Sequence, residues 1–248
     1  MQSLIAKKLK MQFNPIAIIF TNKKPEKAQQ FKKGKWACVI SLLTATAKGK
    51  VAVFSRDNCG CRGAQIGLGF GKSYKDFPGL EYFLSTGEKG REGEAYKKTP
   101  ELAKSSFAQV PATDIPFTYV VFKPLKQVDP KKEKPELVCF YANPDQLSAL
   151  TLLANYARPT NDNVIIPGGS ACCSICLLPY HQSKQKNPKA IIGLTDVTAR
   201  KLVDPDILTF TVPYKMYLEM EQNVEGSFLE KGSWKKVHSR IPSPSKKK

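Results

Sequence analysis

The sequence predicts an α/β fold, an α+β mixed sheet with helices packed against it, in one domain built from two related halves. Short apolar segments of strand length alternate with segments of helical periodicity. The order strand, helix, strand and cysteine–glycine loop occurs twice, over about residues 15–70 and 136–180. We therefore expect a single domain with an internal duplication over residues 1–242 and a disordered basic tail over 243–248.

The first half is expected to hold a short amphipathic helix, a strand, a lysine-rich loop, a longer helix and a second strand. These lie at residues 2–11, 16–20, 22–35, 36–48 and 51–54. Gly49 is a suitable terminator for the longer helix. The second strand leads directly into CGCRGAQIGLGFGKS, residues 59–73. Residues 72–116, rich in Gly, Lys, Tyr and Pro, indicate loops around short helices such as PELAKSSFAQ.

The second half repeats this order. Strands are expected at 118–125, 136–142 and 163–167, with a helix at 146–156 that starts after Asn143-Pro144-Asp145; strands at 191–194 and 207–212 and a helix after Pro213 follow. ISLLTATA in the first half parallels LTLLANYA in the second, and Val51 and Val164 each precede a cysteine by eight residues. Chance similarity of two strand–helix–strand units is the alternative to a duplication.

The glycines of residues 59–73 do not form a phosphate-binding loop. A P-loop needs a glycine five positions before Gly71-Lys72-Ser73, and Ile66 occupies that position. The spacing G-x-G-x-G of Gly67, Gly69 and Gly71 also differs from the dinucleotide-binding fingerprint G-x-G-x-x-G. The glycine segment is instead expected to be a turn or a close backbone approach.

Five of the seven cysteines fall into two clusters, which predict a metal site. They are Cys59, Cys61, Cys172, Cys173 and Cys176. Thiolates are soft ligands that suit zinc, copper(I) and iron–sulfur clusters. If the two loops face each other at one end of the sheet, four of these five sulfurs can form a four-thiolate site. Cys38 and Cys139 lie in apolar runs and are expected in the core.

An iron–sulfur cluster, most readily 4Fe–4S, is favoured over zinc. A zinc ribbon carries two Cys-x-x-Cys pairs, whereas this chain has Cys-x-Cys and Cys-Cys-x-x-Cys. The candidate cofactor-binding residues are Gly60, Gly63, Gly169 and Arg62: glycine-rich backbone donates N–H groups toward cluster sulfides, and Arg62 (with Arg56) offsets cluster charge. Electron transfer or redox sensing is the expected use. Free or transiently oxidised thiols are the simpler alternative.

Two further functions remain open. One is a thiol-dependent enzyme acting on a small molecule in the same cleft; His181 is a conceivable base, although no motif marks it. The other is a polyanion-binding module, because the formal charge is +18. However, only six of the 39 basic residues are arginines and the lysines are dispersed, which favours a solvated surface over a nucleic-acid site.

The sequence indicates a cytoplasmic protein. No apolar run is long enough to cross a membrane, the N-terminus has no secretory h-region, and an odd number of cysteines argues against a disulfide framework. No membrane partner is therefore expected. A redox partner, protein or small molecule, is implied but not identified, and a homo-oligomer is compatible with the sequence.

Five separated motifs resemble the archaeal and bacterial cysteine-rich proteins grouped as domain of unknown function 169. They are SRDNCGCRGAQIGLGFG, FYANPDQLSALTLLANYA, NVIIPGGSACCSICLLP, IGLTDVTARK and FTVPYKMYLEMEQNVEGSFL, within about residues 10–241. The resemblance implies no activity. It implies one cysteine in each loop, Cys61 and Cys172, with Cys59, Cys173 and Cys176 as additions, and residues 195–200 lining the same cleft. Two thiols would suit a redox pair or partial ligation, and the additions would complete a four-thiolate site.

Overall fold

Seven strands form one mixed sheet in the computed structural model, which describes residues 1–243. The strands are β1 (Ile16–Thr21), β2 (Ala52–Phe54), β3 (Tyr119–Pro124), β4 (Leu137–Ala142), β5 (Val164–Ile165), β6 (Ala190–Gly193) and β7 (Leu208–Pro213). Their order is β2-β3-β1-β4-β7-β6-β5, and β5–β6 is the parallel pair in an otherwise antiparallel sheet. The predicted α/β class with a mixed sheet is confirmed.

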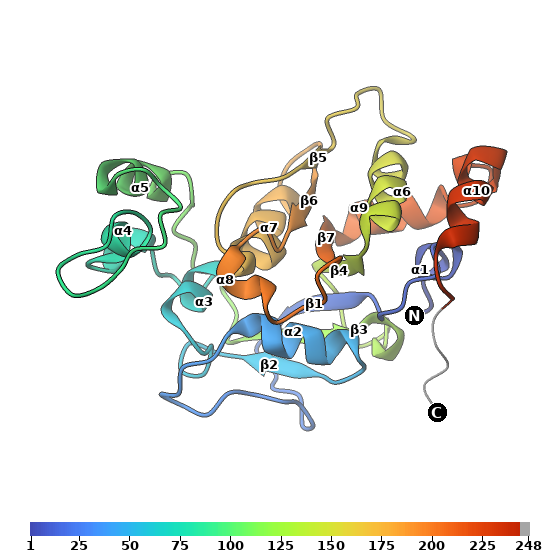
Figure 1. Cartoon of the computed structure of the whole chain (residues 1–248). Coiled ribbons are helices and arrows are strands. Elements are labelled where there is room, and N and C mark those ends of the chain that lie inside the picture. Colours follow the sequence, from blue (N-terminus) through green and yellow to red (C-terminus); the bar gives the residue numbers. More distant parts are fainter. Residues whose placement is uncertain (244–248) are drawn as a thin grey trace.

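Helices cover both faces of the sheet (Figure 1). They are α1 (Leu4–Lys8), α2 (Val39–Ala47), α3 (Arg62–Gly67), α4 (Leu80–Phe83), α5 (Pro100–Phe107), α6 (Pro144–Asn155), α7 (Leu178–Ser183), α8 (Val197–Arg200), α9 (Tyr214–Gln222) and α10 (Gly232–Arg240). A π-helix, η3 (Cys173–Leu177), runs directly into α7.

Strand β1, next to the middle of the sheet, is apolar over residues 16–20 because both of its faces are covered. Ile16 and Ile18 pack in the core beneath α2, α3 and η3, whereas Ala17 and Ile19 pack in the core beneath α1, α6, α9 and α10. The site described below therefore belongs to the first of these faces, where both cysteine segments lie.

The order strand, helix, strand, cysteine segment is present in both halves, as β1-α2-β2 and β4-α6-β5. β1 and β4 are antiparallel neighbours at the centre of the sheet, and β2 and β5 form its opposite edges. α2 and α6, however, cover opposite faces. The descent of the halves from one duplicated unit stays a prediction.

Local sequence signals mark the start of α6 and the end of α2. Asn143 and Gln146 form a capping box at the start of α6, with Pro144 in its first turn, as the sequence predicts. Gly49, with φ of +107°, follows the end of α2.

Two expectations about local structure differ from what is observed. The segment expected to be a second cysteine loop is helical from Ala171 onward, and the strand expected at 163–167 is reduced to Val164–Ile165. The glycine segment starts with the helix α3, and the close backbone approach expected there occurs at Gly67. Most of the expected tail, 244–248, lies outside the described residues.

Residues 72–116 form an excursion from the sheet that carries α4 and α5. In Figure 1 this excursion lies beside α3, on the side of the molecule opposite to α10. The isolated pairing of Phe70 with Asp114 and a hydrogen bond from Ile115 N to Gly69 O (2.8 Å) close the excursion at its base. It therefore starts and ends next to α3 and borders the cysteine segments.

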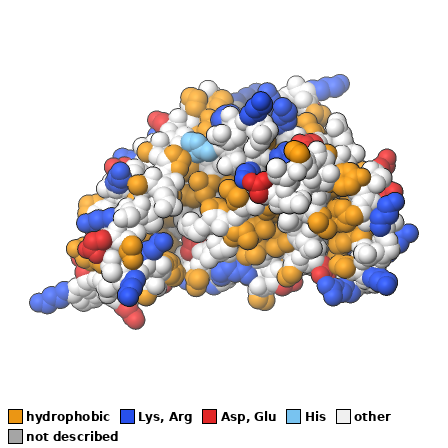
Figure 2. All heavy atoms as spheres, turned by 90° about the horizontal axis from the view of Figure 1, so that it is seen from above, with side chains coloured by type: hydrophobic (Ala, Val, Ile, Leu, Met, Phe, Trp, Pro, Cys, Tyr) orange, Lys and Arg blue, Asp and Glu red, His pale blue; other side chains and the backbone are white. Residues whose placement is uncertain are grey.

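Basic side chains are dispersed on the face shown in Figure 2, in separate groups with hydrophobic side chains between them. This distribution agrees with the dispersed lysines of the sequence. Within residues 1–243, no helix is both long enough and apolar enough to span a bilayer.

Candidate thiol site

The two cysteine segments lie in direct contact, as expected from loops that face each other. Gly67, at the end of α3, packs against Cys172: a Cβ atom at Gly67 would lie 2.3 Å from the Cys172 Cβ and 2.8 Å from its carbonyl carbon. No side chain fits in that space. Gly67 is therefore required by the close approach of α3 to the second segment.

Three thiols from separate segments gather beside this contact, and we call Cys38, Cys61 and Cys172 the three-thiol cluster. Burial, and then the neighbouring Cys61 and Cys38, raise the pKa of the Cys172 thiol well above its ordinary value. Burial and Cys61 likewise raise the pKa of Cys38. Cys38 and Cys61 are half-buried, while Cys172 is 7% exposed, so the cluster is reached from the Cys38–Cys61 side.

Backbone contacts bring Cys38 to the cluster. Ala37 N donates a hydrogen bond to Gly60 O (3.2 Å), which ties the segment before α2 to the turn between Cys59 and Cys61. Gly60 has φ of +91°, and a Cβ there would lie 2.5 Å from Ala37 O. Gly60 thus supports the site by its conformation. Cys38, expected in the core, is half-buried at the residue before α2 and packs against the edge of the core.

Asp196 connects α8 to the cluster. Its Oδ2 accepts a hydrogen bond from Ala171 N (3.2 Å), and its charge raises the pKa of both Cys38 and Cys172, after burial and the other thiols. The ammonium of Lys201 acts in the opposite direction on Cys38. Residues 195–200 thus reach the site through Asp196, whereas Arg200 bonds the carbonyl oxygens of Ile207 and Pro205 and holds the following loop.

The remaining clustered cysteines lie in other surroundings. Cys176 is fully buried in the core beneath the sheet, and burial raises its pKa strongly. Cys173 lies in a small separate core and is within 3.2 Å of the Tyr74 hydroxyl. Burial and then Cys61 raise the pKa of Cys59 to about 11, and its Sγ lies 3.6 Å from Arg56 O.

Within the described part of the chain, no group of three or more His, Cys, Asp or Glu side chains is arranged to hold a metal ion as the structure stands. The expected four-thiolate site therefore requires side-chain movement. Of the five clustered cysteines, Cys61 and Cys172 lie in the three-thiol cluster and Cys59 neighbours Cys61. Cys139 is buried in β4, as expected.

The other candidate residues have distinct positions. Gly63 lies next to Cys61: a Cβ at Gly63 would be 3.8 Å from the Cys61 Sγ. Arg62 lies over the Phe77 ring, 5.4 Å from its centroid. Gly169, with φ of +143°, has open space around its Cα. Arg56, expected to offset cluster charge, instead pairs with Asp114.

His181 belongs to α7 and bonds the Thr113 hydroxyl through Nε2 (2.7 Å). Burial lowers its pKa. This contact ties α7 to the end of the excursion, and it gives the imidazole a structural partner in place of a thiol.

A family model described as uncharacterised ArCR, domain of unknown function 169, matches residues 4–223. No curated protein and no solved structure matches. The family match spans both cysteine segments and all seven strands, and the chain therefore belongs to this ArCR family.

Proposed function

We propose that this chain is a metal-binding protein whose centre is held by the thiolates of the three-thiol cluster, and that the centre is an iron–sulfur cluster used in electron transfer or redox sensing. The observation that carries the proposal is that thiols of separate segments lie near one another: Cys61 and Cys38 both raise the pKa of Cys172, and Cys61 raises that of Cys38.

The chemistry of the donor set supports a soft metal. Without a cation, burial and mutual repulsion favour neutral thiols at Cys38 and Cys172. A bound cation reverses this preference, because a coordinating thiol is deprotonated. Thiolates select zinc, copper(I) and iron–sulfur centres over hard cations.

The fourth ligand of a four-coordinate centre has two candidates in the described structure. Cys59 has its pKa raised by the neighbouring Cys61, and the charge of Asp196 acts on both Cys38 and Cys172. The proposed ligands are thus Cys38, Cys61 and Cys172 with either Cys59 or Asp196. Cys173 and Cys176 are not proposed as ligands, because Cys173 bonds the Tyr74 hydroxyl and Cys176 is enclosed in the core.

Anaerobic purification followed by iron and acid-labile sulfide analysis tests the proposal. We expect a brown protein with stoichiometric iron and sulfide, and loss of both in Cys61→Ala and Cys172→Ala. Cys139→Ala, which removes a buried thiol far from the cluster in sequence and on β4, is the matched control and keeps them. Stoichiometric zinc without sulfide selects the zinc alternative. A colourless, metal-free protein with every thiol titratable contradicts the proposal.

A thiol-dependent enzyme is the second candidate, favoured by the half-exposed position of Cys61 beside the more buried Cys172. Iodoacetamide labelling of metal-free protein, read by mass spectrometry, tests it. We expect Cys61 to be labelled well before Cys172. Labelling of the two residues at equal rates contradicts a special reactive role for Cys61.

A further inference from the structure

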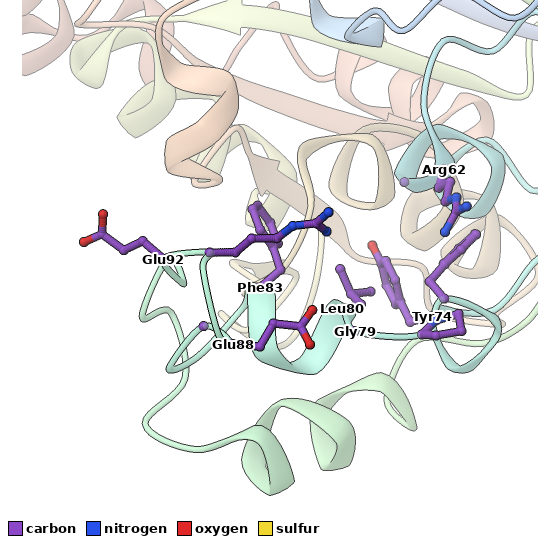
Figure 3. Close-up of a pocket in the computed structure, with 12 residues that line it drawn as sticks. Arg62, Tyr74, Gly79, Leu80, Phe83, Glu88 and Glu92 are labelled. Atoms are coloured by element: carbon purple, nitrogen blue, oxygen red, sulfur yellow. The ribbon is translucent and has the colours of Figure 1, made fainter.

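A cavity of about 280 Å³ lies between α3 and the excursion. Its floor and walls come from the start of α3, from Tyr74 to Phe83, and from the hairpin at residues 87–92. Figure 3 shows Arg62 entering from α3, opposite the side chains of Tyr74, Leu80 and Phe83. The volume suits one aromatic ring with a small substituent, at the lower end of the range for ligand pockets.

Aromatic and aliphatic side chains make up most of the lining. Phe77, Leu80 and Phe83 surround the space together with the ring of Tyr74. Tyr74 is fixed, because its hydroxyl lies 2.7 Å from Ser170 Oγ and its ring packs on Phe107. A flat apolar group placed in the cavity would therefore meet a preformed wall.

Two guanidinium groups, those of Arg62 and Arg91, also line the cavity. Within residues 1–243 neither forms an ion pair, unlike Arg56, Arg158 and Arg240. Arg62 lies over the Phe77 ring, which leaves its N–H groups free at the edge of the guanidinium plane. That edge matches the two oxygens of a carboxylate.

Two carboxylates border the cavity, but they do not neutralise this edge. Figure 3 shows Glu92 extending away from the other labelled side chains. Glu88 lies near Gly79 rather than near Arg62 (Figure 3): its Oε1 would be 3.3 Å from a Cβ at Gly79. The Arg62 side of the cavity therefore favours an anion.

We propose that this cavity binds a small anionic molecule with a flat apolar body, an aromatic carboxylate in its simplest form. The ring would pack between Phe77 and Phe83, and the carboxylate would accept hydrogen bonds from Arg62 and Arg91. The cavity adjoins the thiol site, since Arg62 and Gly63 follow Cys61 directly. The binding does not require a metal at that site.

Benzoate is the probe, and benzamidine, of the same shape and opposite charge, is its control. Titrations of metal-free protein followed by NMR and calorimetry are expected to give saturable benzoate binding and at least about tenfold weaker benzamidine binding, as expected for one charge-assisted contact of about 1.4 kcal/mol or more. Arg62→Gln should weaken benzoate binding about tenfold. Lys89→Gln removes a positive charge from the same hairpin outside the lining and should leave it unchanged.

A second variant fills the cavity without touching its charges. Gly63 lines the cavity and has space for a side chain, with the Cys61 Sγ at ordinary contact distance, so Gly63→Leu should fold and block benzoate. Equal binding of benzoate and benzamidine contradicts the proposal, as does undiminished benzoate binding by either Arg62→Gln or Gly63→Leu.

Discussion

The first cysteine segment, residues 59–67, and the second, residues 169–177, differ in exposure and in backbone conformation. The first is a turn at Gly60 that leads into α3, with Cys61 half-exposed. The second enters the core, where all three cysteines are buried and the chain forms a π-helix. π-Helices are rare and occur frequently at functional sites.

The difference separates two kinds of cysteine. Cys61 and Cys172, at the beginnings of the two helical segments, lie close to each other and to Cys38. Cys173 and Cys176, further along the second segment, fill space in the interior. The first segment thus leaves the three-thiol cluster accessible from solvent, and the second segment forms its buried side.

The contact between the segments is where a substitution should have the largest effect. Gly67→Ala places a Cβ 2.3 Å from that of Cys172 and forces α3 away from the π-helix. We expect a loss of about 3 kcal/mol in the free energy of unfolding, measured by urea denaturation. Gly63→Ala, in the same helix but with only an ordinary contact to the Cys61 Sγ, should instead be neutral or stabilise by up to about 1 kcal/mol. Equal effects of the two substitutions would show that the segments do not pack tightly.

Alkaline pH should destabilise the protein through the Cys59 thiol of the first segment. Its pKa is raised to about 11 in the folded protein, against 9.0 as its ordinary value, first by burial and then by Cys61. The unfolded chain therefore loses this proton first, so the contribution of Cys59 to stability is present below about pH 9 and is lost between pH 9 and 11. In metal-free protein this one thiol should account for about 2 kcal/mol of the loss.

Urea denaturation at several pH values compares the parent with Cys59→Ala. The variant should lose less stability between pH 9 and 11, although other buried thiols keep part of the decline. Identical pH profiles for the two proteins would mean that Cys59 is not held as a neutral thiol.

Serine substitutions should give the smallest effect and distinguish the open segment from the buried one. Cys176→Ser places a hydroxyl in an apolar core and should cost about 1–2 kcal/mol of unfolding free energy. Cys61→Ser, at a half-exposed position, should change the stability of metal-free protein by less than about 0.5 kcal/mol. Thermal or urea denaturation measures both variants. A larger loss of stability in Cys61→Ser than in Cys176→Ser would contradict the assignment of the first segment as the open one.

Much of the fold could be predicted from the sequence because its signals are local. Each signal lies within or next to the element that it predicts: the capping box at Asn143, the terminator Gly49 and the apolar runs of β1 and β4. The second cysteine segment could not be predicted as a helix, because its glycines and cysteines favour a loop. Its helix is stabilised by packing against α3 and β7, which involves residues far away in sequence.

Cys38 shows most clearly what the sequence could not reveal about the site. It lies in the run WACVISLL, which is typical of a core helix. Trp36 in this run is nonetheless 79% exposed, and Ala37 N bonds Gly60 O before α2 begins. This long-range hydrogen bond helps to place the Cys38 thiol near Cys61. The two-segment cysteine hypothesis therefore anticipated that Cys61 and Cys172 lie together and omitted Cys38, which lies with them.

We propose that the metal centre is built from the three-thiol cluster rather than from the cysteines of the two sequence clusters alone. Iron and sulfide analysis of anaerobically prepared Cys38→Ala and Cys176→Ala tests it most directly. We predict that Cys38→Ala loses the metal centre, although Cys38 lies outside both clusters, and that Cys176→Ala retains it. Retention of iron and sulfide in Cys38→Ala, together with their loss in a folded Cys176→Ala, would contradict the account.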